Sequence, residues 1–202
     1  MSLFERNVPG ITEILKNSAI SVAGLGGLGS NAAVSLARSG ISKLIIADFD
    51  HVEQSNLNRQ YYFQSDIGKT KVDALSDHLK NINPDIIVEK HHVKLTKDNM
   101  ISIMGDSDLL IEAFDKASEK KWLIETWAVN FKDKPVIAAS GLSGMGKTED
   151  LKVHRSGNII VCGDEITDIS EGLCAPRVSI VANMQANLAI EWLVKNKKRD
   201  KI

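Results

Sequence analysis

The sequence has 202 residues, of which 43% are hydrophobic and 25% are charged, and its formal net charge is −1. This length predicts one domain, and the near-neutral charge argues against bulk electrostatic binding to nucleic acid or to an acidic membrane. No apolar run reaches the roughly 18 residues of a membrane span, and the N-terminus lacks the layout of a signal peptide. Two cysteines, Cys162 and Cys174, are too few for a disulfide framework or a four-thiolate zinc site, so we expect a reducing, cytoplasmic setting.

Short apolar runs alternate with segments of helical periodicity along the first 140 residues. Such alternation is typical of a parallel, doubly wound α/β sheet. The predicted strands are Ala19–Ala23, Lys43–Ala47, Ile86–Glu89, Leu109–Glu112 and Pro135–Ala139. The predicted helices between them are Leu28–Ser39, Lys71–Asn81, Lys97–Met104 and Ser118–Val129.

The last third of the sequence is less regular. Residues 141–172 are rich in glycine and polar side chains, with strand-like pieces at Leu151–His154 and Ile159–Cys162 on either side of a turn signal at 156–158. These features predict an antiparallel hairpin. Val178–Val194 predicts a long closing helix, because its apolar residues recur with helical spacing.

The first of two glycine-rich patterns, GLGGLG, places Gly24, Gly26 and Gly29 between a predicted strand and a predicted helix. Asp48 lies 19 residues beyond Gly29, at the end of the next strand. An acidic residue in this place hydrogen-bonds a ribose in dinucleotide-binding proteins. The order of strand, glycines, helix, strand and acid therefore predicts a nucleotide site.

The second pattern, GLSGMGKT, fits a P-loop at Gly141, Gly146, Lys147 and Thr148. A P-loop needs a substantial helix after it, because the helix N-terminus and the loop amides hold the phosphates. The turn signal at 156–158 follows Thr148 too closely for such a helix. We interpret this segment as a glycine-rich turn beside the site.

The nucleotide is more consistent with ATP than with NAD. A triphosphate carries more charge than a pyrophosphate and needs cations and a metal. Arg59, Lys71 and Asp115 are expected at the crevice, because the carboxyl ends of parallel strands face the ligand there. One arginine, one lysine and one carboxylate suit a triphosphate with Mg²⁺, although each of them taken alone reads as a surface ion pair.

Several stretches of the sequence resemble the ThiF/MoeB/HesA family, relatives of the ubiquitin-activating enzymes. They are GLGGLGSNAA, IIADFDHVEQSNLNRQ, GKTKVDAL with INPDI, LLIEAFD, and the closing APRVSIVANMQANLAIEWL. The compact length is similar to that of the smaller ThiF-like proteins linked with thiamine synthesis. The resemblance implies that ATP and Mg²⁺ are used to adenylate the C-terminal Gly-Gly carboxylate of a small ubiquitin-like, ThiS-like sulfur carrier, with release of pyrophosphate.

The resemblance also implies roles for individual residues. Asp48 would hold the ribose, and Asp115 would coordinate Mg²⁺ or position the reacting groups. The residues that would contact or orient the phosphates are Asn56, Arg59, Gln60 and Lys71. Members of the family are homodimers in which an N-terminal arginine reaches the partner's ATP, and Arg6 lies in a loosely similar segment.

The sequence departs from the family in its cysteines. Fuller members carry two C-x-x-C pairs for zinc, which are missing here, so we expect no zinc site. The cysteine that the family usually carries before its AP segment would fall near Asp168, whereas Cys174 stands directly before Ala175. Cys174 is either a small buried residue or a reactive thiol at a helix N-terminus. Cys162, in a predicted strand, is expected to serve packing.

The sequence therefore predicts a single Rossmann-like α/β domain, 1–202, with a doubly wound, mainly parallel sheet, an antiparallel C-terminal extension and a long C-terminal helix. Within it, 1–140 would form the nucleotide-binding core and 141–202 a carrier-facing hairpin and helix. The favoured function is sulfur carrier adenylation. Three alternatives stay open: a molybdopterin-type or other carrier, a non-catalytic protein that docks a carrier, and an NAD-dependent oxidoreductase, which would leave Arg59 and Lys71 without roles.

Overall fold

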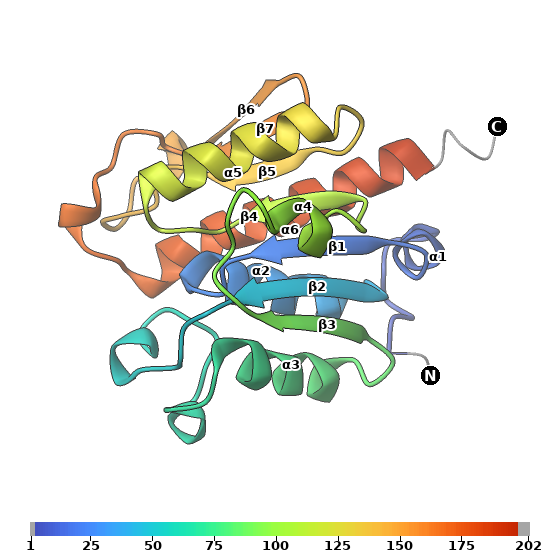
Figure 1. Cartoon of the computed structure of the whole chain (residues 1–202), viewed down its shortest axis with the longest axis horizontal. Coiled ribbons are helices and arrows are strands. Elements are labelled where there is room, and N and C mark those ends of the chain that lie inside the picture. The colour runs from blue at the N-terminus through green and yellow to red at the C-terminus, as the bar shows by residue number, and fades with distance from the viewer. Residues whose placement is uncertain (1–2, 198–202) are drawn as a thin grey trace.

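One seven-stranded sheet, in the order β3-β2-β1-β4-β5-β7-β6, runs through the molecule (Figure 1). The computed structural model describes residues 3–197. The strands are β1 (Ala19–Ala23), β2 (Lys43–Asp48), β3 (Ile87–His92), β4 (Leu109–Glu112), β5 (Val136–Ala139), β6 (Lys152–Ser156) and β7 (Ile159–Gly163). All neighbouring pairs are parallel except β6 and β7. The predicted mainly parallel sheet with an antiparallel C-terminal extension is confirmed.

Helices cover both faces of this sheet. They are α1 (Ile11–Leu15), α2 (Gly27–Ser39), α3 (Lys71–Ile82), α4 (Met100–Met104), α5 (Ala117–Asn130) and α6 (Ala175–Lys197). Side chains alternate along each strand, so Ile20 and Val22 of β1 belong to a core cluster with residues of α1, α2, α3 and α6, whereas Ala23 belongs to a second cluster with residues of α4 and α5. This gives the two helical layers of a doubly wound fold.

Local sequence signals explain where the helices next to the site begin and end. Thr70 precedes α3, and its hydroxyl oxygen accepts a hydrogen bond from the amide of Asp73, which satisfies a free donor of the first turn. Gly40 ends α2 in the left-handed conformation, with φ of 98°, which glycine adopts without steric cost. α6 starts at Ala175, earlier than predicted, because Pro176 fits the first turn of a helix.

Other boundaries also differ from the prediction, such as that of β3, which ends at His92 instead of Glu89, and one helix was not predicted. α4 begins at Met100 instead of Lys97, because Asn99 accepts a hydrogen bond from the amide of Thr96 and donates one to the carbonyl of Lys94, which closes a turn before the helix. The short α1 was not predicted, since five residues are too few to show a helical period.

The sheet order places the candidate site. β1 lies between β2 and β4: β2 and β3 are added on one side of β1, and β4 and β5 on the other, so the strand order reverses between β1 and β4. Ligands of such sheets bind outside the carboxyl ends of the strands at this reversal. The segment after β1 begins at Gly24, and the segment after β4 carries Asp115, so both lie at that end. Among residues 3–197, no helix combines the length and the apolar character that a membrane crossing requires.

Candidate nucleotide-binding site

The segment 24–29, here called the glycine loop, joins β1 to the first turn of α2 and is packed so tightly that two of its positions require glycine. A Cβ on Gly24 would lie 2.9 Å from the carbonyl oxygen of Ala113, and φ of Gly24 is +88°. A Cβ on Gly29 would lie 1.9 Å from the carbonyl oxygen of Gly24. Gly26 differs, because its nearest neighbour would be the side-chain nitrogen of Gln60, at 3.8 Å.

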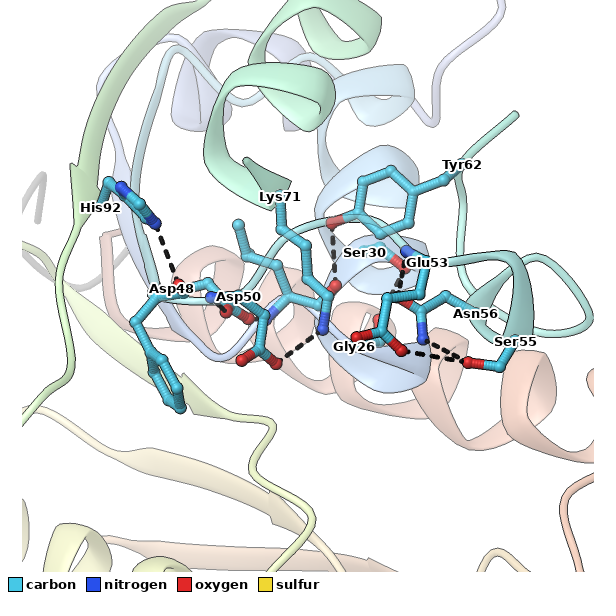
Figure 2. Close-up of polar contacts among 12 residues, drawn as sticks. Gly26, Ser30, Asp48, Asp50, Glu53, Ser55, Asn56, Tyr62, Lys71 and His92 are labelled. Carbon is cyan, nitrogen blue, oxygen red and sulfur yellow. Dashed lines mark hydrogen bonds and ion pairs between the residues drawn. The ribbon is translucent and has the colours of Figure 1, made fainter. Parts of the chain in front are cut away.

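Gly26 is the N-cap of α2 and supplies no side chain to the first-turn amides (Figure 2). These amides and the helix dipole together favour an anion. The tight glycines and the more open Gly26 therefore form a loop suited to phosphate.

Asp48 ends β2 and lies directly beside this loop. One oxygen of its buried carboxylate accepts a hydrogen bond from the amide of Leu25, at 2.6 Å, and the other accepts one from the amide of Asp50, at 2.8 Å. These bonds fix the turn before α2. A carboxylate oxygen has a second lone pair, so Asp48 can also accept a bond from a ligand hydroxyl.

The segment after β2 wraps around the glycine loop. The side-chain amide of Asn31, in α2, donates to the backbone oxygens of Gly27 and Arg59, at 2.7 and 2.9 Å. The Tyr62 hydroxyl donates to the carbonyl oxygen of Leu25, at 2.9 Å (Figure 2). The aliphatic stem of Arg59 would lie 3.5 Å from a Cβ on Gly27. These contacts join the glycine loop to the segment after β2, and the sequence predicted that both belong to the site.

Gln60 carries an unsatisfied polar atom at this place. Its side chain is 8% exposed, and within the described residues its carbonyl oxygen has no hydrogen-bond partner. A buried acceptor left unpaired costs about 1–3 kcal/mol. A ligand hydroxyl or amino group would remove that cost. Asn56, by contrast, is buried, and its side-chain oxygen accepts a hydrogen bond from the backbone amide of Glu53, at 3.0 Å (Figure 2).

The two predicted cations have different surroundings. Lys71, at the start of α3, is buried, and its ammonium lies 2.9 Å from the carboxylate of Asp50 (Figure 2). Arg59 is half-buried and donates only to the backbone oxygen of Ser55 and the side chain of Asn58, so in the described part of the chain it has no carboxylate partner. The sequence reasoning missed Asp50, although it is the second acid of the DFD stretch.

Asp115 lies in the turn between β4 and α5. Its carboxylate is exposed and makes no hydrogen bond or ion pair with residues 3–197. The turn contacts the glycine loop, because a Cβ on Gly24 would lie 3.0 Å from the ring of Phe114. The described residues hold no group of three metal-ligating side chains. Mg²⁺ commonly binds one or two carboxylates together with phosphates and water, so a single free carboxylate fits it.

Arg6 lies away from these residues. Asn7, which follows it, donates to the backbone oxygen of Ser39 at the C-terminal end of α2, at 2.9 Å. The glycine loop is at the other end of this 13-residue helix, about 20 Å away at 1.5 Å per residue. The exposed Arg6 therefore does not reach the glycine loop of its own chain.

The P-loop-like segment takes the form of a turn, as predicted. Thr148–Asp150 is a single 3₁₀ turn, and β6 begins after one further residue, Leu151. The backbone oxygens of Gly146 and Lys147 accept hydrogen bonds from the guanidinium of Arg177, so this loop presents carbonyl oxygens to a cation. A phosphate loop would present amides to an anion instead.

Arg177 also pairs with Asp164, and both side chains are buried. Burial alone would raise the pKa of Asp164, but hydrogen bonds from Thr167 and Ile166, together with Arg177, lower it. The pair joins α6, the glycine-rich loop and the segment after β7. No sequence pattern marks it, because its members meet only in the fold.

The cysteines are placed differently. Cys162 is buried in β7, and burial raises the pKa of its thiol to about 12, so it is a packing residue. Cys174 is half-buried directly before α6. The first turn of α6 packs on the glycine loop, since a Cβ on Gly27 would lie 2.8 Å from the side chain of Val178. Cys174 is thus near the site in the fold.

Fold and topology define a Rossmann-like α/β protein with its glycine loop at the reversal of strand order. The chain belongs to the ThiF family, whose family model matches residues 4–202.

Two curated relatives show how far the likeness extends. The adenylyltransferase and sulfurtransferase MOCS3 of Culex quinquefasciatus is 36% identical over 149 residues, which are 73% of this chain and 33% of the relative. The molybdopterin-synthase adenylyltransferase of Salmonella typhimurium is 29% identical over 188 residues, which are 90% of this chain and 75% of the relative. The chain therefore spans about a third of the first of these relatives.

A solved structure shares the fold. It is the E. coli tRNA N6-threonylcarbamoyladenosine dehydratase, TcdA, in complex with ATP, with a TM-score of 0.84 over 95% of this chain and 91% of that chain. The identity is 21%, so this likeness concerns the fold alone.

Proposed function

We propose that this protein is an ATP-dependent adenylyltransferase that activates the C-terminal Gly-Gly carboxylate of a small ubiquitin-like sulfur carrier. The observation that carries the proposal is that groups suited to different parts of ATP lie together at the carboxyl end of the central strands. The uncapped helix start at Gly26 and the cations Arg59 and Lys71 suit phosphates, and the unpaired oxygen of Gln60 suits a ligand donor. The adenylyltransferase names of the curated relatives agree with this chemistry.

The proposed reaction forms a bond between a carboxylate oxygen of the carrier and the α-phosphorus of ATP, and breaks the bond to pyrophosphate. The nucleophile is already an anion, so no general base is required. Arg59 and Lys71 stabilise the negative charge that develops on the phosphate oxygens. Asp48 binds the ribose, and Asn56 and Gln60 orient the nucleotide. When bound at Asp115, Mg²⁺ supplies further positive charge that favours the departure of pyrophosphate.

We assign the carrier to the loops of residues 141–202. The amide of Gly144 donates to the carbonyl of Gly172, so the glycine-rich loop and the segment before α6 lie together. These two segments expose Met145 and Ile166, which are 80% and 85% accessible. Exposed apolar side chains on paired loops suit contact with a protein partner.

The preferred carrier is ThiS-like, which would place the reaction in thiamine thiazole synthesis. A molybdopterin-type carrier fits the same site equally well. We further propose a homodimer in which Arg6, remote from its own glycine loop, approaches the ATP of the partner subunit. The two free cysteines suit a reducing compartment such as the cytoplasm.

ATP–pyrophosphate exchange tests the proposal. Purified ThiS-like and molybdopterin-type carriers are each added in full-length form and without the terminal glycine. Exchange is expected only with a full-length carrier and Mg²⁺. Exchange that survives the glycine deletion would contradict adenylation of that carboxylate.

Nucleotide choice is tested separately. ATP with Mg²⁺ at about 100 times its dissociation constant should stabilise the protein by about 2.7 kcal/mol. Comparable stabilisation by NAD, with none by ATP, would favour an oxidoreductase. Binding of ATP and of a carrier without any exchange would favour a docking protein.

A further inference from the structure

Glu112, the last residue of β4, is a fully buried carboxylate that the proposed reaction does not use. One of its carboxylate oxygens accepts a hydrogen bond from the amide of Phe114, at 2.7 Å, and another from the ammonium of Lys120, at 3.1 Å. The other oxygen lies 2.9 Å from the same ammonium. Burial raises the pKa of this carboxyl, while Lys120 and the amides of Phe114 and Ala139 act in the opposite direction.

The backbone of Glu112 is held as firmly as its side chain. The buried side chain of Gln185, in α6, donates to the backbone oxygens of Glu112 and Ile137, at 2.8 and 3.0 Å. A buried ion pair adds little net stability compared with apolar residues of similar volume. The buried pair of Glu112 and Lys120 is therefore better explained by the backbone geometry that it fixes than by a gain in stability.

That geometry concerns the turn between β4 and α5. Phe114 directly precedes Asp115, and Lys120 lies in the first turn of α5, which begins at Ala117. The carboxylate of Glu112 therefore binds the chain both before and after Asp115. The turn is also pressed against the glycine loop through its contacts with Gly24. Among residues 3–197, no hydrogen bond or ion pair fixes the carboxylate of Asp115.

We propose that Glu112 and Lys120 form a positioning pair that sets the turn carrying Asp115 against the glycine loop. The proposal rests on the proposed function, because it concerns how Asp115 meets Mg²⁺ and ATP. The pair acts through the backbone, and neither residue needs to touch the nucleotide. Its loss should therefore weaken the contribution of Mg²⁺ to ATP binding, with much less effect on ATP itself.

The test is calorimetric titration of the full chain with ATP, in excess Mg²⁺ and in EDTA. The ratio of the two dissociation constants measures the gain from Mg²⁺. Lys120→Met should lower this gain by about tenfold, at the lower end of the range for groups that orient a metal-binding carboxylate. The affinity of Lys120→Met for ATP in EDTA should stay within about twofold of the wild-type value. Lys120→Arg should keep most of the gain from Mg²⁺, because arginine keeps the charge and can donate to both carboxylate oxygens of Glu112.

Lys121→Met is the matched control. Lys121 is the next residue, its side chain is 75% exposed, and its ammonium lies 3.9 Å from the carboxylate of Glu125. The double variant Glu112→Gln/Lys120→Met removes both charges, so that no unpaired charge is left buried. It should lose the gain from Mg²⁺ as Lys120→Met does. Circular dichroism and thermal melting confirm that each variant is folded.

A folded Lys120→Met protein whose gain equals that of Lys121→Met would overturn the positioning pair alone. Asp115→Ala separates this result from a failure of the proposed function. If Asp115→Ala keeps the full gain, or if wild type does not bind ATP with Mg²⁺, the assigned role of Asp115 fails and the inference fails with it. A gain lost in Asp115→Ala and Lys120→Met, and kept in Lys121→Met, supports the pair.

Discussion

The ammonium of Lys71 lies 2.9 Å from the carboxylate of Asp50, and the side chain of Lys71 is only 7% exposed whereas that of Asp50 is 46% exposed. The backbone amide of Lys71 also donates to the carbonyl of Asp50. The cation assigned to the phosphates is thus already paired before a nucleotide arrives. An incoming phosphate must share this ammonium with Asp50.

Asp50→Asn should therefore strengthen ATP binding measured in EDTA. The change removes a partly solvated negative charge near the phosphates, an effect of about 1 kcal/mol or roughly fivefold in the dissociation constant. Calorimetric titration at two ionic strengths checks this, because screening by salt should reduce the difference. Weaker binding in EDTA would mean that holding Lys71 in place matters more than competing with phosphate.

Lys71→Ala should reduce carrier-dependent ATP–pyrophosphate exchange by about 100-fold, as expected for a group that stabilises the transferred phosphate. Arg59→Ala should have a similar effect. Lys147→Ala, at the exposed lysine of the P-loop-like segment, should cost far less, and it is compared by ATP binding because this loop is also assigned to the carrier. A collapse of ATP binding in Lys147→Ala, with ATP binding unaffected in Lys71→Ala, would reverse the choice between the two glycine patterns.

The two thiols should differ sharply in reactivity. In the native protein near pH 8, iodoacetamide should label Cys174 and leave Cys162 unmodified, since burial raises the pKa of the Cys162 thiol to about 12. Peptide mass spectrometry locates the label, and labelling in urea should modify both residues. Rapid labelling of Cys162 without denaturant would show that β7 opens readily.

Cys174→Ser should keep carrier-dependent exchange, because adenylation needs only groups that handle phosphate. Thiocarboxylate formation is measured on the same variant. Lost exchange in a folded variant would mean that Cys174 shapes the adenylation site. Intact exchange without thiocarboxylate would instead give the thiol a covalent role in passing on the activated carrier.

Asp164→Asn should destabilise the protein by about 3 kcal/mol near neutral pH, because it leaves the buried Arg177 without its partner charge. The folded pKa of Asp164 is lowered, so its contribution exists above the unfolded pKa and disappears as pH falls through the folded value. The difference in the free energy of unfolding between wild type and variant should shrink below about pH 4. Urea unfolding across this range measures it. Glu149→Gln, at an exposed carboxylate, serves as the control. If the difference in the free energy of unfolding between wild type and Asp164→Asn did not change with pH, the predicted role of the Asp164 charge would be wrong.

The sequence predicted best what depends on local burial and backbone shape. Ala19–Ala23 and Leu109–Glu112 match β1 and β4 residue for residue, because strands buried on both faces appear as bounded apolar runs. The glycine loop was also predictable, since Gly24 and Gly29 occupy positions that a Cβ would not fit. Such signals lie within a few neighbouring residues.

Contacts between distant residues could not be predicted in this way. Arg177 and Asp164 become partners only after the sheet and helices have assembled, and Glu112 and Lys120 meet only once the turn between β4 and α5 has formed. Lysine and aspartate are also common surface residues, so a sequence gives no sign that one is buried. Asp50 was missed for the same reason, because nothing in its neighbourhood distinguishes a partner of Lys71 from a solvated acid.

The antiparallel strand β6 has a consequence for the behaviour of the protein in solution. It ends the sheet, and every one of its residues is exposed. An uncovered strand edge invites pairing with the edge of another molecule. Lys152 places a positive charge on this edge, whereas the guanidinium of Arg155 is paired with the carboxylate of Glu191, and a charged side chain on an edge strand opposes such pairing. We therefore attribute to β6 a protective role against fibrous association.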